Sequence, residues 1–284
     1  MDDQFEYVNC LICGKDDTEV FVRGNGPARI VRCRNDGFLF LNPRPKSSRL
    51  RESFREYVPN ISMFTDFRRD VLRREARVIK KVKPGGNLLD IGCSIGTFFE
   101  NFDIRNWHLY GIEPSLFNAR EAQSRYPAEV FCGVLQEAKY PTAFFDVITV
   151  LDTIYYFPDL KSDLLEIRRC LKDDGLLAIE IQGINYWLLR DKGPICWLLE
   201  RKWSRMSTHS SRLYYFSPLT LRLLLEATGF RVVGVVPEQA SLSKGGLVHV
   251  ANNVHFALAK LLFKATAGRF SIAGRELYLA MKMK

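Results

Sequence analysis

An acidic residue followed by a glycine turn is the stretch of this chain whose residue types most clearly suit ligand chemistry. Residues 87–100 read N-L-L-D-I-G-C-S-I-G-T-F-F-E, and the short apolar run at their start is typical of a buried parallel strand. Asp90 lies near the end of that strand, and Gly92 and Gly96 follow in a tight turn before a helix that can begin at Thr97. Glycines let a backbone approach a ligand closely, and a helix N-terminus offers free N–H groups. The carboxylate would repel a phosphate at this place and attract a positively charged group.

A second acid follows at the end of the next apolar run. Residues 109–113, L-Y-G-I-E, predict a short strand that ends in Glu113, about 20 residues after Gly92. A carboxylate at the tip of this strand can accept hydrogen bonds from both hydroxyls of a ribose. An ordinary strand-end glutamate is the alternative, but its place after Asp90 and Gly92 favours the ribose role.

The order of these residues resembles motif I of the class I methyltransferases, written D/E-x-G-x-G-x-G, with Ser94 in place of the middle glycine. The G-x-G-x-x-G fingerprint of dinucleotide-binding proteins is not met. The resemblance implies an α/β fold with a doubly wound, Rossmann-like, seven-stranded and mostly parallel sheet, whose last strand, residues 274–282, runs antiparallel. It also implies that S-adenosylmethionine binds at these positions: Asp90, Gly92, Ser94, Gly96, Glu113, Leu135 and Asp152. For Leu135, cover over the adenine ring and simple core packing remain equally open.

Cysteines near the N-terminus have the spacing of a metal site. Cys10 and Cys13 form a C-x-x-C-G sequence, and Cys33 and Asp36 form a C-x-x-D-G sequence. Structural zinc is bound tetrahedrally by such pairs, and it accepts both cysteine sulfur and carboxylate oxygen. The sequence therefore predicts a small zinc-binding segment, with a metal-free hairpin that carries unpaired thiols as the alternative.

These cysteines and two further motifs resemble one group of bacterial methyltransferases that carry an N-terminal zinc-binding segment. The further motifs are F-L-F-L-N-P-R-P at residues 38–45 and L-Y-Y-F-S-P-L-T-L at residues 213–221. The resemblance implies an acceptor from sugar, polysaccharide or natural-product pathways. The expected organisation is a zinc-binding segment at 1–46, a helical connector at 47–83, and a methyltransferase domain at 84–284 with a lid insertion at 183–212 and a helical insertion at 246–267.

The candidates for a general base depart from that group. Relatives often have Glu-His where this chain has Tyr155 and Tyr156, and Arg212 stands at a position that they fill with histidine. For an oxygen acceptor the candidates are His209, Tyr156 and Tyr155, in that order. Methyl transfer from S-adenosylmethionine is an in-line displacement on an already activated donor. Correct positioning of the reactants lowers its barrier by about 7–11 kcal/mol, so a base is not essential.

Charge and composition restrict the partners without selecting one. The net charge of +9 suits an anionic partner, and the lid insertion is rich in tryptophan and arginine, which suit a sugar ring that bears a phosphate. An RNA or protein methyltransferase is the first alternative, although no single-strand-binding motif is present; a non-catalytic S-adenosylmethionine-binding protein is the second. The apolar helix at 246–267 is expected to pack on its own domain or to contact a membrane surface or a second copy.

The cellular compartment is expected to be the cytoplasm. The first residues do not form a signal peptide, no apolar run reaches 18 residues, and seven cysteines, an odd number, argue for reduced thiols.

Overall fold

The computed structural model describes residues 4–23, 27–58, 66–192, 212–239 and 246–283. Within it the chain forms two compact units. The first, here the cysteine unit, comprises Met1–Lys46, Ile181–Ala227 and Val235–Glu276; the second, here the sheet unit, comprises Ser47–Glu180, Thr228–Gly234 and Leu277–Lys284. Residues 47–83, which the sequence suggested as a connector, thus share a unit with the central strands. The N-terminal segment shares its unit with two segments from the second half of the chain.

A seven-stranded sheet is the centre of the fold, in the order β12-β13-β10-β9-β6-β7-β8. The strands are β6 (Gly86–Ile91), β7 (Trp107–Glu113), β8 (Ala128–Cys132), β9 (Phe145–Leu151), β10 (Leu171–Ile181), β12 (Phe230–Glu238) and β13 (Arg275–Lys282). Strands β6, β7, β8, β9 and β10 pair in parallel. Because β6 lies between β7 and β9, the strand order reverses there, and open α/β sheets bind ligands at such a switch point.

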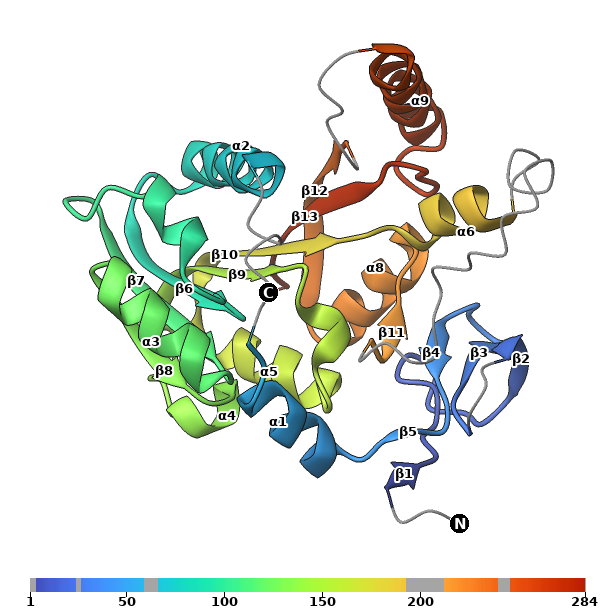
Figure 1. Ribbon diagram of the computed structural model, residues 1–284, viewed down its shortest axis with the longest axis horizontal. Helices are drawn as coiled ribbons and strands as arrows, with labels where there is room; N and C mark the ends of the chain where they lie inside the picture. Colours follow the sequence, from blue (N-terminus) through green and yellow to red (C-terminus); the bar gives the residue numbers. More distant parts are fainter. Residues whose placement is uncertain (1–3, 24–26, 59–65, 193–211, 240–245, 284) are drawn as a thin grey trace. The chain divides into compact units, whose positions relative to one another are not determined.

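Parallel strands must be covered on both faces, and their side chains are accordingly apolar. Leu88, Leu89, Val147, Ile148 and Val150 are fully buried. The helices of the sheet unit, arranged around β6–β10 in Figure 1, are α1 (Ser47–Arg55), α2 (Asp66–Val82), α3 (Leu116–Arg125), α4 (Leu135–Ala138) and α5 (Leu160–Cys170). Two 3₁₀ helices, η2 (Thr97–Asn101) and η3 (Ile154–Tyr156), follow β6 and β9. The helix that the sequence predicted after the glycine turn is therefore the short 3₁₀ helix η2.

The cysteine unit contains a small antiparallel sheet in the order β11-β4-β3-β2. Its strands are β2 (Thr18–Arg23), β3 (Arg29–Cys33), β4 (Leu39–Leu41) and β11 (Tyr214–Tyr215), and a separate pair joins β1 (Phe5–Glu6) to β5 (Arg44–Pro45). The unit's helices are α6 (Ile184–Lys192), α8 (Pro218–Ala227) and α9 (Gly246–Ala265).

Pairing of β11 with β4 brings the L-Y-Y-F motif against the F-L-F-L motif. Tyr214 pairs with Phe40 and Tyr215 with Leu39, while the Arg44 guanidinium donates to the Tyr214 hydroxyl at 2.7 Å. Phe38, Phe216 and Tyr214 stack on one another, with ring centroids 5.3–6.2 Å apart. An aromatic core thus joins the two motifs, which lie far apart in the sequence.

Candidate active site and metal centre

Glu113 ends β7 with its carboxylate anchored by the backbone. One carboxylate oxygen accepts from the Ser94 N–H and the other from the Ser115 N–H, each at 2.9 Å. The residue is 7% exposed, and burial raises the pKa of its carboxyl in spite of these bonds. The Asn118 side chain also bonds this carboxylate, and because a carboxylate has about four acceptor sites it can still accept from a ligand hydroxyl.

Asp90 is the second buried acid of this edge. It lies opposite Gly111 of β7 and Thr149 of β9, and the Thr149 hydroxyl donates to its Oδ1 at 2.7 Å. Burial raises the pKa of Asp90 to about 7, while the Thr149 bond and the charge of Arg68 act in the opposite direction. The protonated and ionised forms of Asp90 therefore coexist near neutral pH, and a cationic ligand would favour the ionised form.

The turn between these acids has the backbone that motif I requires. Gly92 and Gly96 both have φ of +79°, and a Cβ at Gly92 would lie 2.4 Å from Thr153 Cγ2. Ser94 has φ of +51°, so it adopts the left-handed conformation in place of the motif's middle glycine. The expected ligand residues Asp90, Gly92, Ser94, Gly96 and Glu113 therefore lie on two adjacent strand ends and on the turn that follows β6.

Arg68 of α2 is a residue of this site that the sequence did not single out. Its guanidinium lies 2.6 Å from Glu180 Oε2, and the Glu180 side chain is completely buried. The backbone of Glu180 also accepts from the Asp152 N–H at 3.2 Å. Arg68 therefore links α2 to the end of β10 and lowers the pKa of Asp90 through its charge. A basic residue in a helix with many arginines gave no signal of this role.

Tyr57, directly after α1, is the second residue missed. The Ser115 hydroxyl donates to the Tyr57 carbonyl at 2.6 Å, and the Phe54 ring of α1 meets the Tyr156 ring edge to face at 5.9 Å. Burial raises the pKa of the Tyr57 phenol, with smaller contributions from Tyr156 and Glu113. The end of α1 thus lies beside the same strand ends as the acids.

The remaining predicted residues have different environments. Leu135 begins α4 and is 3% exposed, and Asp152 follows β9 with φ of +60°. Tyr155 is 1% exposed within η3, whereas its neighbour Tyr156 is partly exposed. His209 and most of the lid, residues 193–211, lie outside the described residues.

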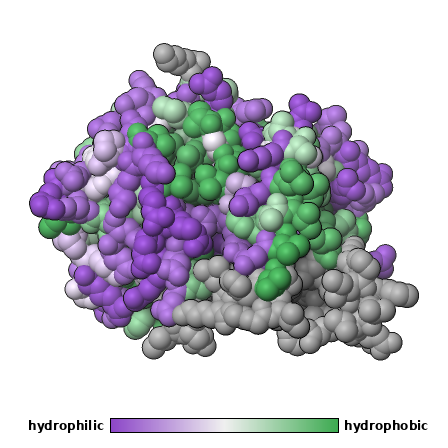
Figure 2. Space-filling model, turned by 90° about the horizontal axis from the view of Figure 1, so that it is seen from above, coloured by the Kyte–Doolittle hydropathy of each residue, from purple (hydrophilic) through white to green (hydrophobic). Residues whose placement is uncertain are grey.

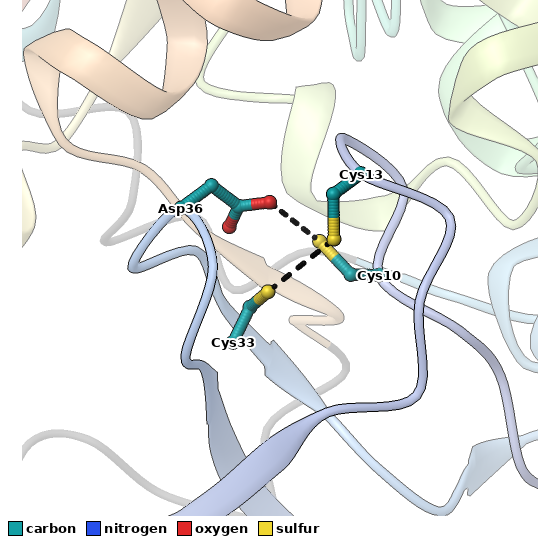
Figure 3. Close-up of side chains that lie close together, drawn as sticks. All are labelled: Cys10, Cys13, Cys33 and Asp36. Atoms are coloured by element: carbon teal, nitrogen blue, oxygen red, sulfur yellow. Dashed lines mark hydrogen bonds between the residues drawn. The ribbon is translucent and has the colours of Figure 1, made fainter.

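Three cysteines and an aspartate gather in the cysteine unit, as Figure 3 shows. The Cys10 thiol lies 3.2 Å from Asp36 Oδ2, the Cys13 and Cys33 sulfurs are 3.5 Å apart, and all four ligand atoms lie within 4.8 Å of one another. Ligand atoms of a tetrahedral zinc site are about 3.3–3.8 Å apart, given metal–ligand bonds of about 2.0–2.3 Å. The donor set is one that zinc accepts, and the two shortest separations are close to the tetrahedral spacing.

The backbone around the cluster supports that fit. Gly14 and Gly37 have φ of +74° and +75°, and their N–H groups donate to the carbonyls of Cys10 and Cys33, which closes a tight turn after each ligand pair. Asp36 Oδ1 accepts from the Phe38 N–H at 2.9 Å, so Oδ2 is the oxygen directed at the thiols. Burial raises the pKa of Cys10, whereas that of Asp36, which burial alone would raise, is lowered by the Phe38 N–H and the three thiols. A bound cation would take the place of the thiol protons.

Comparisons with known proteins agree with this geometry. Residues 62–235 match the family model described as a methyltransferase domain. A ubiquinone biosynthesis O-methyltransferase from Rhodopseudomonas palustris is 26% identical over 107 residues, which cover 36% of this chain and 42% of the relative. The chain therefore spans less than half the length of that relative.

Solved structures share the fold. A SAM-dependent methyltransferase from Archaeoglobus fulgidus superposes with a TM-score of 0.53 at 19% identity, over 76% of this chain and 96% of its own. A protein from Pyrococcus horikoshii superposes with a TM-score of 0.54 at 16% identity, over 81% of this chain and 98% of its own. The sheet order and the two buried acids beside a glycine turn agree with the family model, which matches more than half of the chain, and the chain therefore belongs to the methyltransferase domain family.

Proposed function

We propose that the carboxyl edge of β6 and β7 holds the methyl donor, with Glu113 on the ribose and Asp90 near the positively charged part. The anchored carboxylate of Glu113 is the observation that carries this proposal, because two backbone N–H groups fix its orientation before any ligand arrives. Gly92, Ser94 and Gly96 would bring the turn close to the donor, and Asp152 and Leu135 would line the neighbouring loops. S-adenosylmethionine supplies an already activated methyl group when it is bound.

The protein's own contribution is then to position the reactants and to exclude water. A well-oriented pair of reactants gains about 7–11 kcal/mol from positioning alone. Arg68 would hold Glu180 and α2 at the edge of the site, and Tyr57 would lie beside the ribose acid. Where the acceptor must lose a proton, Tyr156 is the phenol in the described residues best placed to take part, since Tyr155 is buried.

Donor binding tests the first part of the proposal. Glu113→Gln keeps the size of the side chain but loses one acceptor oxygen, so affinity for S-adenosylhomocysteine should fall by about 1–3 kcal/mol, or roughly five- to 150-fold. Glu129→Gln, an exposed residue of the next strand, is the matched control and should bind as the wild type does. Equal affinity of all three proteins in calorimetry would refute the assignment of Glu113.

For the acceptor we propose a small molecule, a sugar or saccharide precursor that bears a phosphate or nucleotide. The net charge of +9 and the tryptophans and arginines of residues 183–212 support it, as does the resemblance of the N-terminal motifs. The Rhodopseudomonas relative is named an O-methyltransferase, which supports oxygen as the atom methylated. RNA and protein acceptors are the competing candidates.

An acceptor screen with labelled donor separates these candidates. Nucleotide-sugars or lipid-linked saccharides should be methylated, and Tyr156→Phe should slow the transfer by up to about 10²-fold where a base is used. Tyr155→Phe tests the general effect of losing a phenol beside the site. Transfer only to RNA, with a steep linear fall of log affinity against log salt, or only to protein, would overturn the saccharide proposal.

We further propose that Cys10, Cys13, Cys33 and Asp36 hold a structural zinc ion. Gently purified protein should contain about one zinc per chain by elemental analysis. Asp36→Ala should lower that content, Asp36→Cys should retain it, and Asp16→Ala, an exposed acid of the same segment, should leave it unchanged. Wild-type protein free of metal, or an Asp36→Ala variant with full zinc content, would exclude this ligand set.

A further inference from the structure

Helix α9 has one face that packs on its own unit. Ala259 is completely buried, and the distance from Nε2 of His255 to the carbonyl oxygen of Ile272 is 3.0 Å. The same ring meets Tyr186 of α6 edge to face at 5.8 Å. These contacts fix which side of the helix is directed inward.

The opposite face is apolar and exposed. Val250, Val254, Leu258 and Leu261 are 57%, 55%, 52% and 64% exposed, and Leu262 adds to them at 39%. The spacing of three and four residues places Val250, Val254, Leu258 and Leu261 on one side of the helix, away from Ala259, and Leu262 lies at the border of that side. Figure 2, in which the molecule is seen from above, shows apolar surface on the side where α9 stands in Figure 1. We call these five residues the α9 strip.

Positive charge borders this strip. Lys260 and Lys264 are exposed along one flank, and Arg269 and the exposed Phe270 follow at the same end of the helix. No Asp or Glu occurs from Gly246 to Arg275. A long apolar strip with lysines beside it and no carboxylate is the pattern of a helix that lies in the interface of an anionic bilayer.

A second copy of the chain fits this surface less well. Lysine is depleted at protein–protein interfaces, and a two-fold symmetric contact places the same surface patch on both partners. Such a contact would place the lysines that flank both α9 strips in the interface, and neither helix has a carboxylate to pair with them. In the described residues no helix is long and apolar enough to cross a membrane.

From these observations we infer that α9 is a docking surface for anionic lipid bilayers. The helix lies parallel to the membrane, with Val250, Val254, Leu258 and Leu261 buried among the acyl chains nearest the headgroups. Lys260 and Lys264 contact the lipid phosphates. The surface places the enzyme on a membrane.

Vesicle flotation with the full-length protein tests this inference. Phosphatidylglycerol-containing vesicles should bind the protein at least tenfold more tightly than pure phosphatidylcholine vesicles, and added salt should weaken the binding. Leu258→Ser with Leu261→Ser should reduce the binding at least tenfold. Lys260→Gln with Lys264→Gln should reduce it by about fivefold for each lysine removed.

Matched controls distinguish a variant that binds vesicles poorly from one that is misfolded. Leu219→Ser on α8 changes a leucine that is 52% exposed away from the strip, and it should bind vesicles as the wild type does. Each variant should keep wild-type affinity for S-adenosylhomocysteine, which monitors the fold. Absence of vesicle binding, equal losses with Leu219→Ser, or a wild-type dimer that becomes monomeric in the leucine double variant would overturn the inference.

Discussion

The carboxyl edge of β6 and β7 and the cysteine cluster both hold buried polar groups, but they hold them in different ways. At the sheet edge the protein satisfies its own acids: Glu113 accepts two backbone N–H groups, and Asp90 accepts the Thr149 hydroxyl. In the cluster the three thiols and Asp36 mainly contact one another. The edge is therefore organised before a ligand binds, whereas the cluster is a set of ligands that a cation would complete.

The surroundings explain this contrast. The edge stands on strands whose side chains are fully buried, so its geometry follows from a large apolar core. The cluster stands on two tight turns beside β3 and β4, whose apolar side chains are buried, and the turns are closed by backbone hydrogen bonds. We expect a bound cation to add order to these turns, whereas packing alone orders the sheet edge.

Removal of zinc should produce the largest difference between the two regions. Structural zinc contributes an apparent 10–16 kcal/mol, roughly, in small zinc-binding peptides, so a chelator should sharply lower hydrogen-exchange protection in β2, β3 and β4. Protection in β6 and β7 should change little. Mass spectrometry after hydrogen exchange measures the protection of both sets of strands in one sample. An equal loss of protection in the two regions would contradict the difference between them.

Loss of Arg68 should be the most damaging single change at the sheet edge. Arg68→Ala removes the guanidinium beside the buried Glu180, and breaking such a pair costs about 3–5 kcal/mol of unfolding free energy. Arg73→Ala, on the same helix, removes an exposed ion pair with Asp70 and should cost less than about 1 kcal/mol. Urea unfolding measures the stability of both variants. Similar midpoints would show that packing, without the Arg68 ion pair, stabilises the sheet edge.

Donor binding should strengthen as the pH rises, because the proposed site attracts the positively charged part of the donor through the carboxylate form of Asp90. Burial raises the pKa of Asp90 from 3.8 to about 7, so the donor-free protein loses stability as pH rises through this interval, and the carboxylate forms around neutrality. Affinity for S-adenosylmethionine should increase by about tenfold from about pH 6 to about pH 8. In Asp90→Asn this increase should vanish; a wild-type profile in that variant would assign the dependence to another group.

The smallest effect should come from the strained position in the turn. Ser94→Gly removes a left-handed cost of about 1–2 kcal/mol and adds about 0.5–1 kcal/mol of glycine entropy, so the protein should become more stable by up to about 1.5 kcal/mol. Ser94→Ala keeps the strain and should not gain this stability. Thermal unfolding with and without donor measures the change, and destabilisation by glycine would show that the serine side chain supports the turn.

The sequence predicted the strands of the sheet well, because a buried parallel strand requires an uninterrupted apolar run. The runs at 88–91 and 109–113 lie in β6 and β7 and end where these strands end, although each strand begins two residues earlier. Asp90 and Glu113 could be found because polar residues at the ends of such runs stand out. Their meeting across the turn followed from the general geometry of parallel sheets.

Arg68 and Tyr57 could not be found in the same way. Arg68 is one of several arginines on α2, and only the arrangement of that helix beside β10 distinguishes it from the others. The role of Tyr57 depends on its backbone carbonyl, which every residue has. The pairing of β11 with β4 involves two residues on each strand, too few for any periodic pattern.

That pairing also has a consequence for the time course of biosynthesis. Translation delivers β2, β3 and β4 together with all four cluster ligands early, but β11 emerges only after β6 to β10 have been synthesised. The nascent chain can capture a cation while its small sheet still lacks an edge strand, and the β4 edge stays uncovered until Tyr214 and Tyr215 arrive. During that interval an exposed aromatic edge is open to pairing with other chains. A nascent chain stalled before residue 214 should accordingly recruit chaperones that the chain released from the ribosome no longer needs.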